Sequence, residues 1–283
     1  MLRAASILLR VAAGAAAAGA PSAIAATDDA PATDILSRLA AFEERWEETP
    51  AVRGAATVKV YGEEESNFTL AWGRLRPDRT RLEVSAPLYG TAVVLTARGE
   101  EMLAYYPHEN AAVVMTAEEW NPSAVLGTAF DYNLHELVDG LLGQPPLYLV
   151  DGTAAALEVE ATPGDSGGEK IVWRRAETSS RVQELTLSAA FAGGERRPLH
   201  LRLFEADAPV VDVTYAEWTP AVGEGPAAPR AVTLKTEDRV AEIRITKLEF
   251  DVAFPEGAFS TTPPAGAAVY EPAPAAERYD EID

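Results

Sequence analysis

The sequence has 283 residues and contains no cysteine. The chain can therefore form no disulfide, offer no thiolate to a metal and carry no lipid on a cysteine side chain. Histidine is nearly as scarce, because only three are present, and their positions share no spacing that is typical of metal ligands. Phosphate-binding loops and dinucleotide-binding fingerprints are also missing from the sequence. We therefore predict that the protein holds no metal and no cofactor.

Basic residues are few as well, with 24 lysines and arginines against 44 aspartates and glutamates, so the formal net charge is −20. A field of this sign repels the phosphate backbone of nucleic acids and the head groups of anionic lipids. The composition thus argues against a nucleic-acid partner. Hydrophobic residues make up 47% of the chain, which is ample for a folded core.

The N-terminal residues have the pattern of a signal peptide. Arg3 and Arg10 accompany an apolar run from 7 to 19, and Ala23-Ile24-Ala25 matches a cleavage site of small residues. The run is too short and too rich in alanine for a membrane span. We predict a signal peptide at 1–26 and hence an exported protein.

Most of the sequence after residue 55 alternates between apolar and polar side chains, which is the pattern of half-buried strands. Turn residues separate the alternating stretches at hairpin spacing, and no helix long enough for a parallel crossover lies between them. The predicted strands are 55–61, 66–76, 79–86, 91–97, 101–106, 111–115, 155–161, 169–175, 181–189, 198–204, 209–218, 230–237 and 240–252. Because a sheet of this length must curl, we predict a mainly β (α+β) fold built on a single long curved antiparallel sheet.

Two helices are expected to cover this sheet. The first, at 34–48, has an apolar face of Ile35, Leu39, Phe42 and Trp46. The second, at 131–142, is rich in leucine and ends at Gly143. His135 is expected on the exposed flank of this second helix.

No internal repeat and no long linker divides the chain. We therefore predict one domain at 27–270, followed by a mobile acidic tail rich in proline and alanine at 271–283. Thr116 and Glu119 can form a capping box. The apolar phase changes within the last long strand, which predicts a β-bulge near Thr246-Lys247.

One segment imitates an enzyme motif. Gly164-Asp165-Ser166-Gly167-Gly168 copies the nucleophile loop of chymotrypsin-like serine proteases, but no histidine has the sequence context that such a triad needs, and Glu169 replaces the expected proline. A hairpin loop explains the segment fully. We predict no catalytic residue and a binding protein rather than an enzyme. An enzymatic alternative rests on Ser166 alone and could be tested by serine-directed labelling.

The segment from Gly73 to Gly90 indicates a strand, a turn, a second strand and a second turn. Pro77-Asp78 supplies the first turn. Leu88 and Tyr89 occupy the second turn, where large apolar side chains are unusual. They either fold back onto the core or project as a contact surface.

In their order along the chain, several of these residues resemble the outer-membrane lipoprotein receptor LolB and its soluble partner, the lipoprotein carrier LolA. The features that match are Arg53-Gly54, Trp72, Asp78-Arg79-x-Arg81-Leu82, Pro87-Leu88-x-Gly90, Leu126-Gly127, Leu134, Leu137, Leu141-Leu142-Gly143 and Pro145, with Arg76-Pro77 matching LolA. A fainter likeness follows at Phe254-Pro255, Phe259 and Pro263-Pro264. The chain departs from LolB in having no cysteine to carry a lipid, which suggests a periplasmic protein that is not lipidated.

This resemblance implies an unclosed half-barrel with an N-terminal helix and a short helical lid. It also implies a monomeric periplasmic carrier or chaperone that holds the acyl chains of lipoproteins or another lipid for delivery to the outer membrane, in contact with an inner- or outer-membrane partner. The alternative is a regulatory sensor of the same fold, of the anti-sigma-factor binding type, that acts through protein contacts.

Strand phase selects the residues of the expected lipid-binding cavity, because it places them on one face of the sheet. They are Phe68, Leu70, Trp72, Leu82, Val84, Val93, Leu95, Met102 and Tyr106. The same pattern would arise in a packed core, so both readings stay open. The resemblance implies that Arg76 latches the lid and that Leu88 and Tyr89 form a tip that touches a membrane or a partner.

Overall fold

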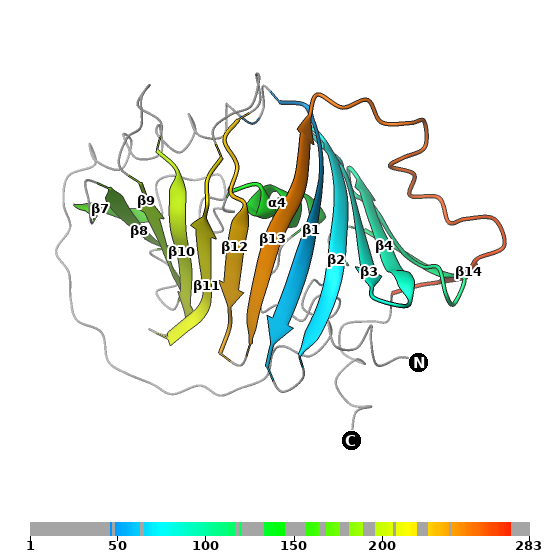
Figure 1. Ribbon diagram of the computed structural model, residues 1–283, viewed down its shortest axis with the longest axis horizontal. Helices are drawn as coiled ribbons and strands as arrows, with labels where there is room; N and C mark the ends of the chain where they lie inside the picture. The colour runs from blue at the N-terminus through cyan, green and yellow to red at the C-terminus, as the bar shows by residue number, and fades with distance from the viewer. Residues whose placement is uncertain are drawn as a thin grey trace.

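The computed structural model describes residues 46, 49–62, 65–116, 119, 133–144, 157–164, 168–175, 181–188, 196–205, 208–219, 226–237 and 239–272. Within them, fourteen strands form one sheet in the order β14-β6-β5-β4-β3-β2-β1-β13-β12-β11-β10-β9-β8-β7 (Figure 1). The strands are β1 (Ala51–Tyr61), β2 (Ser66–Leu75), β3 (Arg79–Ala86), β4 (Gly90–Arg98), β5 (Glu101–Tyr106), β6 (Ala111–Thr116), β7 (Leu157–Pro163), β8 (Glu169–Arg175), β9 (Arg181–Leu187), β10 (Pro198–Glu205), β11 (Ala208–Ala216), β12 (Ala231–Lys235), β13 (Val240–Phe250) and β14 (Ala268–Tyr270). The described helix is α4 (Leu134–Leu141). The predicted mainly β fold with one long sheet is confirmed, and the sheet is open.

The sheet is antiparallel except at one edge. There β14 pairs in parallel with β6, through Ala268 opposite Ala111. The prediction of a wholly antiparallel sheet is wrong at this point, and β14 was missed altogether. β14 has only three residues, in a stretch rich in proline and glycine, so its sequence is too short to show the alternation of a strand. These residues form a strand because they pair with the free edge of β6.

A β-bulge and a capping box occur where the sequence predicts them. Thr246 is the extra residue of a β-bulge, because Lys247 pairs with Ala55 while Ile245 pairs with Ala56. Thr116 and Glu119 exchange the two hydrogen bonds of a capping box. Both predictions are confirmed.

Three predictions fall largely outside the described residues. The helix expected at 34–48 is described only at Trp46, which is helical and buried. The signal peptide at 1–26 and all but the first two residues of the tail at 271–283 also lie outside. In the described part of the chain, no helix has the length and apolarity needed to cross a membrane.

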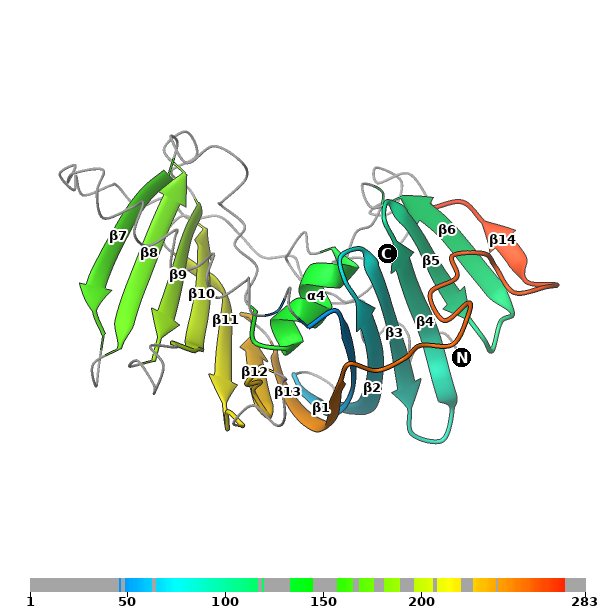
Figure 2. The same ribbon diagram turned by 90° about the horizontal axis from the view of Figure 1, so that it is seen from above.

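The sheet curves around α4, which lies in its concave side (Figure 2). Strand register carries one apolar face across the four central strands β3, β2, β1 and β13, since Val84, Leu70, Ala56 and Ile245 follow one another on adjacent strands. Two buried apolar clusters lie on this face, one around α4 and one on β8 to β12, and Ile243 contacts both. The concave side is therefore the apolar side of the molecule.

The segment 251–267, which we call the strap, lies on the convex side and connects β13 to β14 (Figure 1). The Phe254 ring covers Gly73, where a Cβ atom would lie 2.7 Å from the ring. Arg81 Nη1 donates to the Ala258 carbonyl at 3.4 Å, and Thr261 Oγ1 donates to Glu101 at 2.8 Å. The strap is thus fixed to the convex face by packing and by hydrogen bonds.

A glycine in β1 makes room for the central aromatic residue of the concave face. A Cβ atom on Gly54 would lie 2.2 Å from the Trp72 ring, and Trp72 is buried. We expect Gly54→Ala to lower the free energy of unfolding by about 2 kcal/mol, because the ring must move within a packed core. Urea denaturation measures this loss. Trp72→Phe should restore part of it in the double variant. An unchanged stability in Gly54→Ala alone would contradict the prediction.

Candidate functional site

The residues selected by strand phase do lie together on the concave face. The structure places all nine in a single apolar cluster with α4: Phe68, Leu70, Trp72, Leu82, Val84, Val93, Leu95, Met102 and Tyr106. Six of them are buried, whereas Phe68, Leu70 and Tyr106 are partly exposed. Near α4 this surface is packed against protein, whereas the three partly exposed residues pack against the cluster and remain partly accessible to solvent.

α4 covers this surface with an amphipathic helix. Its buried residues Leu134, Val138 and Leu141 face the sheet and pack against β2, β3 and β4. The helix begins at Asn133, whose side chain accepts from the Glu136 backbone while the Glu136 carboxylate accepts from the Asn133 backbone. This capping box satisfies two backbone donors that would otherwise lack partners. Gly143 ends the helix with a φ of 88°, as the sequence predicts.

A polar cluster of Arg74, Arg76, Asp139 and Gln144 joins α4 to the end of the sheet where β2 turns into β3. Arg74 is the most buried member, with only 4% of its side chain exposed. Its Nε and Nη2 atoms donate to the two carboxylate oxygens of Asp139 at 3.2 Å. Asp139 belongs to α4, so this ion pair joins the helix directly to β2.

Arg76 is the second arginine of the cluster. Its Nη2 atom donates to Asp139 Oδ1 at 3.0 Å and also to the Gln144 side chain. The Arg76 guanidinium lies 5.9 Å from the centre of the Trp46 ring, within cation–π range. Asp139 therefore bridges two arginines, and the bonds described for Arg76 go to side chains in the C-terminal half of α4 and just after its end.

His135 is a third contact between α4 and the sheet. Its Nδ1 atom lies 2.6 Å from the hydroxyl of Thr80, which is fully buried on β3. Burial lowers the pKa of His135 to about 4, and the positive charge of Arg74 adds to this effect. The expectation that His135 is exposed is wrong, because the packing of α4 against β3 turns its ring inward.

The low pKa of His135 gives stability a specific pH dependence. The unfolded side chain gains its proton near pH 6.5, whereas the folded one gains it near pH 4. Between these values the unfolded state binds more protons, so stability should fall as pH drops from 6.5 towards 4. Arg74 and Arg76 strengthen this effect, and Asp139 and Asp78 oppose it.

We expect His135→Gln to reduce this pH dependence, as followed by urea denaturation across the same range. His108→Gln is the control, because His108 is exposed on the β5–β6 turn. Equal pH profiles for the two variants would contradict the prediction.

The predicted tip lies at the other end of the sheet. β1 to β6 form a meander, so the β3–β4 turn and the β5–β6 turn are at the end opposite the Arg74 cluster. Leu88 is fully exposed, at 102% relative accessibility, and Tyr89 is 59% exposed. The two side chains therefore project into solvent and do not fold back onto the core.

The sequence reasoning missed Arg74, Asp139 and Thr80. Arg74 could have been found, because Phe68, Leu70 and Trp72 set a phase that places positions 74 and 76 on the same concave face. A buried arginine on such a face requires an acidic partner. No sequence signal distinguishes Asp139 from the many other carboxylates.

The protease-like segment connects β7 to β8. The Gly164 amide donates to the Gly168 carbonyl at 2.9 Å, which closes a hairpin turn. Ser166 lies outside the described residues. Among the residues that are described, no group of three or more histidines and carboxylates could hold a metal ion.

Comparison with known proteins relates the fold to solved structures. No protein-family model matches the chain, and no curated protein matches it significantly. A domain from Vibrio parahaemolyticus named for outer-membrane lipoprotein sorting is 13% identical, with a TM-score of 0.55 over 78% of this chain and 95% of that one. A DUF1329 family protein from Desulfovibrio piger is 11% identical, with a TM-score of 0.59 over 81% and 97%.

A LolA superfamily protein from Nitrosomonas europaea is 8% identical, with a TM-score of 0.50 over 80% of this chain and 96% of that one. In each comparison nearly the whole of the other chain is covered, so the similarity extends over the complete fold and not over a fragment. The protein described here has the LolA-like fold of lipoprotein-sorting domains.

Proposed function

We propose that this protein is a periplasmic carrier or chaperone that binds the acyl chains of lipoproteins, or of another lipid, on the concave face of its sheet. The observation that carries the proposal is an apolar concave face on an open sheet, on which the eight-residue helix α4 packs over β2 to β4 in the described part of the chain. The fold likeness to lipoprotein-sorting and LolA superfamily structures supports it. We infer that binding, not catalysis, is its role.

In this proposal α4 is the lid. An acyl chain contributes about 0.8 kcal/mol for each methylene removed from water. The apolar side of α4 covers the same surface that the lipid would occupy, so a bound chain replaces one apolar partner with another. The net free energy of opening is then set mainly by the polar contacts of the helix, above all those that Arg74 and Arg76 make with Asp139. These two arginines are the proposed latch.

A fluorescent fatty acid, such as dansyl-undecanoic acid, tests the proposal. We expect saturable binding near one-to-one. Leu70→Gln should weaken it about tenfold, because Leu70 is a partly exposed residue of the concave cluster. Thr69→Gln is the matched control, since Thr69 is the adjacent residue on the convex face and is exposed. Absence of saturable binding, or equal effects of the two substitutions, would sink the proposal.

A further inference from the structure

The concave face of β2 changes from charged to apolar along its length. Arg74, Trp72, Leu70 and Phe68 alternate with outward-facing residues, so they follow one another on this face at intervals of about 7 Å. Arg74, at the end where β2 turns into β3, belongs to the latch. Trp72 offers one N–H donor, and the side chains of Leu70 and Phe68 are pure hydrocarbon. The strand thus presents a charge, a single donor and an apolar stretch, in that order.

The indole N–H of Trp72 is the unusual member of this row. Its Nε1 atom is buried, and no acceptor among the described residues forms a hydrogen bond with it. The residue as a whole is only 3% exposed. A buried donor without an acceptor destabilises a fold, whereas a phenylalanine would occupy the same position without that penalty. Packing alone therefore does not explain a tryptophan here.

Gly54 allows the donor edge of the ring to extend across β1. The ring atoms nearest to a Cβ atom built on Gly54 are Cζ2, Cε2 and Nε1, at 2.2, 2.3 and 2.8 Å. Gly54 pairs with Trp72 on one side and with Leu248 on the other, so this edge lies over β1, between β2 and β13. Leu82 and Leu95 continue the row beyond Trp72. The donor thus has apolar neighbours in both directions along the row.

These surroundings select the chemistry of an acceptor. A carboxylate or a phosphate at this depth would be buried among Leu82, Leu95 and Leu248, which is strongly unfavourable for a charge. A neutral carbonyl group is far less unfavourable to bury once it accepts a hydrogen bond. Esters and amides of fatty acids carry such a carbonyl directly at the end of a hydrocarbon chain. Their structure therefore fits both the donor and the apolar stretch beside it.

We propose that Trp72 determines the specificity of the concave site, because its indole N–H donates to the ester or amide carbonyl of an acylated lipid. This inference rests on the proposed function, since it concerns the same surface, and the carbonyl reaches Nε1 once α4 has opened. The acyl chain lies over Leu70 and Phe68, and the head group lies towards Arg74. The preferred ligand is therefore an esterified or amidated acyl chain and not a plain hydrocarbon of equal length.

The first test compares methyl laurate with dodecyl methyl ether, which has the same chain but lacks the carbonyl oxygen. Each displaces dansyl-undecanoic acid from the full chain, and we expect the ester to act at about fivefold lower concentration. Trp72→Phe should bring the ratio of the two affinities close to one. A loss of packing in this variant affects both ligands, so it cancels in the ratio.

Trp218→Phe is the matched control. The Nε1 atom of Trp218 is also buried without an acceptor among the described residues, but its ring packs against Gly143 just after α4 and belongs with the apolar cluster on β8 to β12. This variant should keep the preference for the ester. Loss of the preference in both variants would show that it does not depend on the Trp72 donor.

A spectroscopic test uses the wild-type protein and does not depend on how the variants fold. In the ¹⁵N-labelled chain, methyl laurate should move the indole proton signal of Trp72 downfield, and the ether should not, because only the carbonyl accepts a strong hydrogen bond. If dansyl-undecanoic acid fails to bind, the proposed function is wrong and this inference falls with it. If it binds but the ester and the ether displace it equally, only the role of Trp72 is overturned.

A carbonyl of this kind occurs both in the acylated end of lipoproteins and in phospholipids. A diacylated lipopeptide and phosphatidylethanolamine, each presented to the labelled protein in the same detergent micelles, separate the two sources. A downfield shift of the Trp72 signal with either one supports the proposal and identifies the source. Absence of a shift with both would overturn it.

Discussion

Replacing Asp139 with asparagine is expected to lower the free energy of unfolding by about 3 kcal/mol, as measured by urea denaturation. Asparagine has nearly the same shape, so the packing of α4 is kept and the charge alone is lost. Arg74, which is 4% exposed, would then carry a buried charge without its carboxylate, and Arg76 would lose the same partner. Removing one member of a buried ion pair lowers the free energy of unfolding by more than the intact pair contributes to it, because the other charge stays buried without its partner.

A matched substitution separates this effect from the general loss of a negative charge. Asp78 lies in the turn between β2 and β3 and contacts Arg79 at 3.9 Å, with about half of each side chain exposed. Asp78→Asn should change stability by less than about 0.5 kcal/mol, since exposed pairs contribute little. Similar losses in the two variants would show that the Arg74–Asp139 pair is no stronger than a surface contact.

Strand positions could be predicted closely because apolar and polar side chains alternate along a half-buried strand with a period of two residues. The predictions at 79–86, 101–106 and 169–175 match the structure at both ends. β1 was predicted to begin at 55 but begins at Ala51, where it pairs with Leu75 of β2. Its first residues are strand because a neighbour completes their hydrogen bonds, which is a tertiary effect without a local pattern.

The same limit explains which parts of the site were found. The apolar members were predictable, because alternation assigns each of them to a face. The polar contacts were not, since Arg74 and Asp139 are 65 residues apart in sequence and meet only when α4 packs on the sheet. The packing of the strap was equally hidden, because Phe254 reaches Gly73 on the convex face from a segment without regular structure.

The tip at Leu88 combines full exposure with an unfavourable backbone. Its φ of 71° is in the left-handed region, which a leucine rarely adopts and which costs about 1 kcal/mol. An exposed leucine contributes no burial energy to offset that strain. A strained and exposed apolar residue is therefore a candidate for contact with something outside the molecule, and we propose a membrane or a partner protein.

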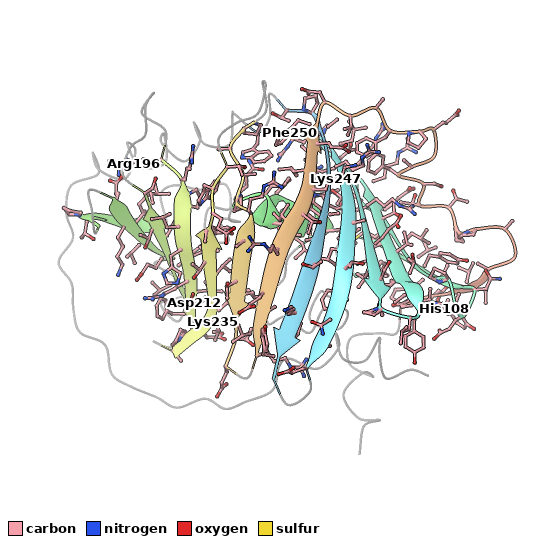
Figure 3. The ribbon with its side chains drawn as sticks, in the orientation of Figure 1. His108, Arg196, Asp212, Lys235, Lys247 and Phe250 are labelled. Atoms are coloured by element: carbon pink, nitrogen blue, oxygen red, sulfur yellow. The ribbon has the colours of Figure 1, made fainter. Side chains whose placement is uncertain are left out.

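Leu88→Glu should leave the thermal midpoint within about 2 °C of the wild type, because the side chain is already in water. It should reduce transfer of a bound fluorescent fatty acid to liposomes at least about tenfold, because a charge opposes insertion at the lipid surface. Leu88→Gly should lose transfer too while gaining stability, since glycine relieves the positive φ. His108→Glu is the control for added charge, because His108 is exposed at the same end of the sheet (Figure 3). If Leu88→Glu lowered the melting temperature strongly, or if both glutamate variants slowed transfer equally, Leu88 would not be the contact residue.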